Sequence, residues 1–114
     1  MKMKAAVLRQ TGAPRPYATS RPIQIEEVEL DPPKEGELLV KIAGGGVCHS
    51  DLSVMNGDRS RPVPLVLGHE GSGEVVEVGP GVRDMQPGDA VIFQFSASCG
   101  RCVNCLGGRT LVCE

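Results

Sequence analysis

Short apolar runs separated by turn residues dominate the chain and predict a mainly β organisation. Five stretches are predicted as strands: residues 3–8, 22–30, 38–43, 72–79 and 90–95. Glycine and proline mark the turns between them, as in Gln86-Pro87-Gly88-Asp89 before the last stretch. Strands at turn spacing, without long helices between them, favour a barrel or a sandwich.

Alternation of apolar and polar residues indicates which strand positions face a core. The second stretch is expected to be half-buried, with Ile23, Ile25, Val28 and Leu30 as its apolar positions, and in the third stretch Val40 and Ile42 are expected on one face. Residues 48–56 lack this alternation and are predicted as a loop that enters a short helix closed by Gly57. The run Gly44-Gly45-Gly46 before them predicts a bend or a close approach of the backbone.

Composition narrows the function classes. The 114 residues include only one Tyr and two Phe, so branched aliphatic residues must build the core. The formal net charge of −2 and the lack of a dense basic patch argue against a nucleic-acid partner. No apolar run approaches the roughly 20 residues of a membrane span, and the one after Lys4 is too short for a signal peptide. We therefore expect a cytoplasmic protein, with no membrane partner and with reduced thiols.

Four of the five cysteines lie close together near the end of the sequence. Cys99, Cys102 and Cys105 are separated by two residues each, and Cys113 follows after seven more. Four thiolates suit a tetrahedral zinc ion and leave no open position, which predicts a structural site. A disulfide-bonded or buried set and an iron–sulfur cluster are the alternatives. The bacterial ferredoxin pattern differs from this one in its last gap and in having Pro after the fourth Cys.

A second metal site is indicated only weakly by spacing. Cys48 and His69 are candidate ligands, with Glu70 near them, and Asp51 could fix the tautomer of His69. Two protein ligands are one fewer than a catalytic zinc usually has. A hydrogen-bonded structural histidine and a core cysteine therefore remain open as the alternative.

Several motifs in a fixed order carry a family resemblance. The chain contains Val47-Cys48-His49-Ser50-Asp51, then Gly68-His69-Glu70-x-x-Gly73, then Gly79-x-x-Val82, and then the four-cysteine series. It resembles, from about Lys4 to its last residue, the N-terminal part of zinc-containing alcohol dehydrogenases of the medium-chain dehydrogenase/reductase superfamily. The resemblance implies a GroES-like β-barrel catalytic domain portion over residues 1–114, with a structural-zinc lobe over residues 96–114.

The resemblance also implies roles for individual residues. Cys48 and His69 match catalytic-zinc ligands, and Glu70 and Asp51 match acids beside that zinc. Ser50 matches the hydroxyl that relays the substrate proton, although it could instead merely cap the short helix. His49 matches a position that contacts the cofactor pyrophosphate. The structural-zinc ligands are matched by Cys99, Cys102, Cys105 and Cys113.

Two parts of the family pattern are missing from the sequence. The further ligand of the catalytic zinc lies downstream of this segment in the family, and no G-x-G-x-x-G within a βαβ unit marks a Rossmann domain. We therefore expect a fragment or a truncated product, with an incomplete barrel, that is inactive alone. In the complete enzyme, expected to be a homo-oligomer, hydride would pass between a small alcohol or carbonyl substrate and NAD or NADP. A non-catalytic zinc-binding module is the alternative.

Overall fold

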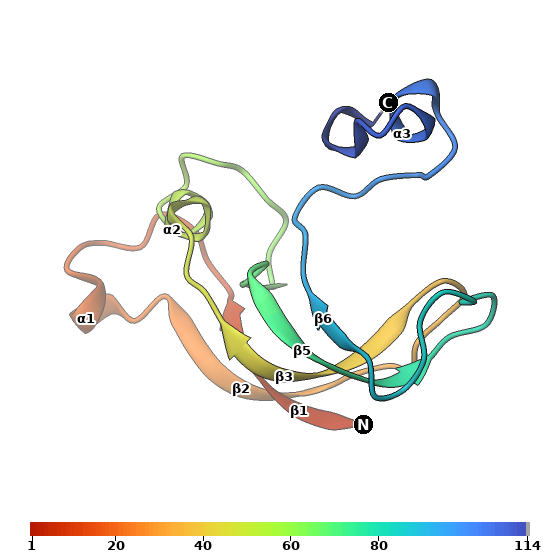
Figure 1. The fold of residues 1–114 in the computed structure, drawn as a ribbon. Helices are drawn as coiled ribbons and strands as arrows, with labels where there is room; N and C mark the ends of the chain where they lie inside the picture. Colours follow the sequence, from red (N-terminus) through yellow and green to blue (C-terminus); the bar gives the residue numbers. More distant parts are fainter. Residues whose placement is uncertain (114) are drawn as a thin grey trace.

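Two three-stranded sheets form the framework of the computed structural model, which describes residues 1–113 (Figure 1). The first sheet has the order β2-β1-β4, with β1 at Lys2–Leu8, β2 at Ile23–Glu29 and β4 at Leu65–Val66. The second has the order β3-β5-β6, with β3 at Leu38–Gly45, β5 at Gly71–Val78 and β6 at Ala90–Ile92. Every pairing is antiparallel. The mainly β prediction is therefore confirmed.

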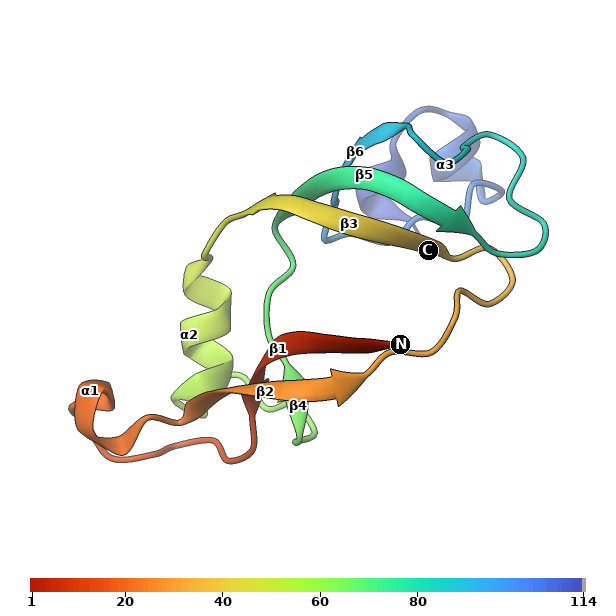
Figure 2. The same ribbon diagram turned by 90° about the horizontal axis from the view of Figure 1, so that it is seen from below.

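The two sheets lie as separate layers (Figure 2). Helix α2, at His49–Met55, follows β3 and stands at one end of the layers, where the chain passes from one sheet towards the other. Gly57, after the helix, has φ 92°, which glycine adopts without a steric penalty. The predicted short helix closed by Gly57 is thus confirmed.

The C-terminal residues form a small lobe apart from the sheets (Figure 1). It contains α3 at Val103–Leu106 and the 3₁₀ turn η1 at Thr110–Val112. Neither these short elements nor α1 at Tyr17–Ser20 is marked by an apolar period in the sequence. None of the helices within residues 1–113 has the length and apolarity that crossing a membrane requires.

The core is small and aliphatic, as the composition predicts. Its buried side chains are Ala5, Val7, Leu8, Val54 and Val75. The accessible surface is 8500 Å², whereas a compact monomer of this mass exposes about 6,000 Å². Between the sheets lies a hollow of about 770 Å³, lined by residues of both sheets such as Met3, Leu38 and Val40. The sheets do not close into a barrel within the described residues, which agrees with the expected incomplete barrel.

One predicted core position is wrong. Ile25 is 70% exposed. Val40 and Ile42 line the same hollow between the sheets, as expected of residues on one face. In β2 the register with β1 is unbroken, so Ile25 and Val28 must point to opposite faces. The structure half-buries Val28 and leaves Ile25 outside. The last predicted strand is also too long, because β6 ends at Ile92.

An ion pair ties the end of β1 to β2. The Arg9 guanidinium donates two hydrogen bonds to Glu26, Nε to Oε1 at 2.8 Å and Nη2 to Oε2 at 2.6 Å. The hydrogen bond from Arg9 lowers the pKa of the Glu26 carboxyl. Because the pKa of Glu26 is lower in the folded state, the ion pair stabilises the fold at pH values above the unfolded-state pKa of 4.5. This stabilisation disappears as the pH falls through the folded-state pKa.

We expect Arg9→Gln to lower the thermal midpoint at pH 7 and to match the unsubstituted chain in strongly acidic buffer, where Glu26 is protonated. Circular dichroism melts at several pH values measure the difference. Lys4→Gln is the matched control, since Lys4 is an exposed cation on β1 without an ion pair among residues 1–113. An equal loss in both variants at pH 7 would contradict the expectation.

Candidate metal centres

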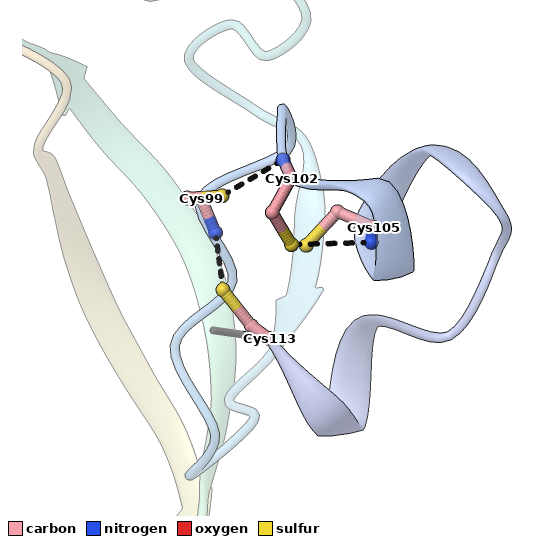
Figure 3. A group of neighbouring side chains, drawn as sticks. All are labelled: Cys99, Cys102, Cys105 and Cys113. Atoms are coloured by element: carbon pink, nitrogen blue, oxygen red, sulfur yellow. Dashed lines mark hydrogen bonds between the residues drawn. The ribbon is translucent and has the colours of Figure 1, made fainter.

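Four cysteine side chains converge in the C-terminal lobe (Figure 3). Their sulfur atoms all lie within 4.8 Å of one another. Cys99 precedes α3, Cys102 is its N-cap, Cys105 lies within it, and Cys113 follows η1. None of the five cysteines forms a disulfide within residues 1–113. The group could hold a metal ion.

Backbone N–H groups face these sulfurs. The Cys99 sulfur accepts from the N–H of Arg101 at 3.4 Å and of Cys102 at 3.3 Å, and these bonds lower the pKa of its thiol. Desolvation raises the pKa of the Cys105 thiol to about 11. A metal must therefore displace a firmly held proton from Cys105, which makes metal binding weaker in acid.

A second group of donors lies at the start of α2. Cys48, His69 and Glu70 offer ligand atoms within 4.8 Å of one another. Cys48 is the N-cap of α2, and the other two residues lie between β4 and β5. Hydrogen bonds from Ser50, and then from His69, lower the pKa of the Cys48 thiol. The hydrogen bond with Cys48, followed by the charge of Asp51, raises the pKa of His69.

Each nitrogen of the His69 ring faces a polar side chain, Asp51 at Nδ1 and Ser50 at Nε2. Oδ1 of Asp51 lies 3.4 Å from Nδ1, and Oγ of Ser50 lies 3.4 Å from Nε2. Asp51 also accepts a hydrogen bond from the backbone N–H of Cys48 at 3.4 Å, so it connects both donors. Because Cys48 is the N-cap, Ser50 does not cap the helix, and that alternative for Ser50 is wrong.

The second group opens into a hollow of about 670 Å³. Cys48, Ser50, His69 and Glu70 line its polar side. Its other wall consists of residues that the sequence analysis did not assign to a site: Arg59, Ile92, Phe93, Gln94 and Phe95. No motif identifies them, and the apolar pattern predicts the two Phe residues as part of a strand. His49 does not line this hollow; its Nδ1 lies 3.5 Å from the Ser53 hydroxyl.

Gly46 leaves room for the Glu70 side chain. A Cβ at Gly46 would meet the Glu70 carboxylate oxygen and would lie 3.1 Å from its Cβ. The N–H of Gly46 donates to the Glu70 carbonyl at 3.0 Å, so the two backbones are fixed together. The predicted close approach at the glycine run is therefore confirmed at this position.

We expect Gly46→Ala to displace the Glu70 carboxylate and to weaken metal binding at the second group, with a loss of about 1 kcal/mol in stability. Gly44→Ala is the matched control, because its Cβ would lie at an ordinary 3.4 Å from the Ser72 hydroxyl. Metal titration and thermal unfolding of both variants give the comparison. Equal metal affinity in the two variants would show that Gly46 has no such role.

Known proteins share this arrangement of sequence and fold. The family profile "Alcohol dehydrogenase GroES-like domain" matches residues 34–114. An NDMA-dependent alcohol dehydrogenase of Amycolatopsis methanolica is 46% identical over 114 residues, which are 100% of this chain and 29% of that protein. An S-(hydroxymethyl)glutathione dehydrogenase of Escherichia coli O1:K1 is also 46% identical, over 99% of this chain and 29% of its own length. The chain thus spans less than a third of these relatives.

A solved structure agrees with these sequence matches. The cobalt- and zinc-bound thermostable alcohol dehydrogenase of Pyrobaculum aerophilum superimposes with a TM-score of 0.83 and 33% identity. The match covers 100% of this chain and 33% of that one. The chain therefore belongs to the zinc-containing alcohol dehydrogenases of the medium-chain dehydrogenase/reductase superfamily, and it corresponds to their N-terminal GroES-like domain.

Proposed function

We propose that residues 1–114 are the N-terminal catalytic portion of a zinc-dependent dehydrogenase that transfers hydride between a small alcohol and the corresponding aldehyde or ketone. NAD or NADP would accept the hydride in the complete enzyme, which we expect to be a homo-oligomer. The observation that carries the proposal is the presence of two separate donor groups. One consists of four thiols, and the other is a Cys-His-Glu group that opens into a hollow.

The four cysteines would hold a structural zinc in the lobe at residues 96–114, whose last residue, Glu114, lies outside the described part. Four protein sulfurs fill a tetrahedral ion and leave no position for a substrate. Four thiolates and one Zn²⁺ leave two negative charges. Arg101 and Arg109 lie in the same lobe and would offset them.

Cys48 and His69 would hold the catalytic zinc, with Glu70 beside it. When bound, that ion would supply a Lewis acid that polarises the substrate oxygen. Asp51 would keep the proton of His69 on Nδ1, leaving Nε2 as the ligand atom. The hollow next to these donors has the space and the apolar wall that a small organic substrate needs.

Ser50 would receive the proton of the substrate hydroxyl. A hydroxyl can accept one hydrogen bond while it donates another, so it can pass a proton on from a site that excludes water. Ser50 lines the hollow and lies two residues from Cys48, which suits a relay. His49 is exposed on the same helix turn and would contact the cofactor pyrophosphate.

We expect the purified chain to bind one zinc ion tightly at the four cysteines and a second one only weakly at Cys48, His69 and Glu70. We also expect no cofactor-dependent turnover, since residues 1–113 form no βαβ unit that could hold a dinucleotide. Metal analysis after dialysis and an absorbance assay of NADH and NADPH formation measure both. An iron–sulfur cluster would instead give a brown protein with visible absorption.

Activity is tested by placing the chain in the corresponding segment of the E. coli relative. The chimera should oxidise primary or secondary alcohols with NAD or NADP, and Cys48→Ser should abolish turnover. A folded, zinc-loaded chimera without turnover would favour the non-catalytic module.

A further inference from the structure

A second hollow adjoins the one at the Cys-His-Glu group. Its volume is about 270 Å³, and the two share Ser50, Arg59, His69 and Phe95. Arg61 also lines the second hollow. The combined space is therefore lined by two aromatic side chains, Phe93 and Phe95, and by two cations, Arg59 and Arg61, next to the metal donors.

Neither guanidinium group has a counter-ion within the described residues. Arg59 and Arg61 are exposed, and neither forms an ion pair with any residue in 1–113. Asp58, between α2 and these residues, instead accepts a hydrogen bond from the Asn56 side chain at 2.8 Å. Asp51, which lines the same space, is held by His69 and by the N–H of Cys48. Two positive charges are thus left for a ligand.

The backbone of Arg59 is fixed to the helix that carries Ser50. Its N–H donates to the Ser53 carbonyl at 2.9 Å, and the N–H of Gly57 donates to Val54 at 3.3 Å. The loop after α2 therefore continues the helix end by hydrogen bonds. This anchoring places Arg59 at a set position relative to Ser50 and Cys48.

We propose that Arg59, with Arg61 beside it, binds an anionic group of the substrate, so that the hollow prefers alcohols or carbonyl compounds bearing a carboxylate. The planar guanidinium matches the two oxygens of a carboxylate, whereas an apolar wall holds the body of the molecule. The inference rests on the proposed function, because it assigns the hollow to the substrate. Phosphate offers the same chemistry, and the experiment separates the two.

The test compares 4-(hydroxymethyl)benzoate with its neutral amide analogue, 4-(hydroxymethyl)benzamide, in calorimetric titrations of the zinc-loaded 114-residue chain. We expect the carboxylate to bind roughly tenfold tighter, equivalent to about 1.4 kcal/mol, and the preference to shrink in 1 M salt because exposed charges are screened. Arg59→Gln should remove the preference, and Arg61→Gln should reduce it. Arg83→Gln is the matched control, because it removes one exposed arginine that lines neither hollow.

Equal affinity for both probes, no detectable binding of the carboxylate, or a preference that survives Arg59→Gln would overturn the inference. A preference that disappears in Arg83→Gln as well would do the same, since it would reflect net charge alone. Benzyl phosphate and inorganic pyrophosphate are the further probes. If Arg59→Gln weakens only their binding, the guanidinium serves a phosphate and the carboxylate assignment is wrong.

The variant Cys48→Ser distinguishes a wrong anion-site assignment from a wrong catalytic-zinc assignment. Cys48→Ser removes a metal donor but leaves both arginines, so the carboxylate preference should persist in it. Loss of the preference in that variant overturns the inference. Absence of metal binding at Cys48 and His69, with the preference intact, overturns the catalytic-zinc assignment and leaves the anion site standing.

Discussion

Cys102→Ser is expected to release the metal of the lobe and to unfold residues 98–113, while the two sheets stay folded. None of these residues is buried, so apolar packing cannot hold the lobe together. A structural zinc contributes about 10–16 kcal/mol at neutral pH, as much as the total stability of a typical domain, about 5–15 kcal/mol. Cys102 also accepts the hydrogen bond of the Cys105 N–H at 3.4 Å and caps α3.

Trypsin and metal analysis measure this result together. Arg101 and Arg109 lie within the lobe and become cleavage sites when it unfolds. Cys48→Ser is the matched control, because it removes one thiol outside the lobe and should leave the lobe resistant. Unchanged metal content and protease resistance in Cys102→Ser would mean that the four cysteines are not a structural metal site.

Ser50→Ala, in the chimera with the E. coli relative, is expected to lower turnover by roughly 10²–10⁴-fold. The hydroxyl lies 3.4 Å from Nε2 of His69 and lines the hollow, so its loss removes the group placed to receive the substrate proton. Stability should change little, because the N-cap of α2 is Cys48. Ser50→Thr keeps a hydroxyl and should retain most of the turnover.

Ser53→Ala is the matched control for this experiment. Ser53 lies on the same helix but lines neither hollow. Its hydroxyl donates a hydrogen bond to the His49 carbonyl at 3.2 Å. Zinc content is measured in every variant, so that metal loss is not mistaken for loss of the relay. Normal turnover in Ser50→Ala with full zinc occupancy would remove Ser50 from the mechanism.

The sequence predicts the strands of this fold well because each is short and bounded by turn residues. Which face is buried is harder to predict, as Ile25 shows, since apolar residues occur at both parities of β2. The short elements β4, α1 and η1 have no periodic signal. The position of β4 depends on pairing with distant residues, such as Leu65 opposite Leu8, whereas α1 and η1 are single turns closed by local hydrogen bonds.

The two donor groups likewise differ in how far the sequence alone predicts them. The four cysteines are close in sequence, so their convergence follows from spacing alone. Cys48 and His69 are 21 residues apart, and only the fold and the motif order bring them together. Arg59 and Phe95 belong to no sequence motif. They line the hollow because the loop after α2 and the segment after β6 come together in the fold.

Anomalous diffraction at the zinc edge, from crystals of the chain grown with excess zinc, shows whether both donor groups hold a metal ion. We expect one strong peak among the sulfurs of Cys99, Cys102, Cys105 and Cys113. We expect a second, weaker peak between Cys48, His69 and Glu70. No peak at either group, or a signal at the iron edge from the four sulfurs, would contradict this expectation.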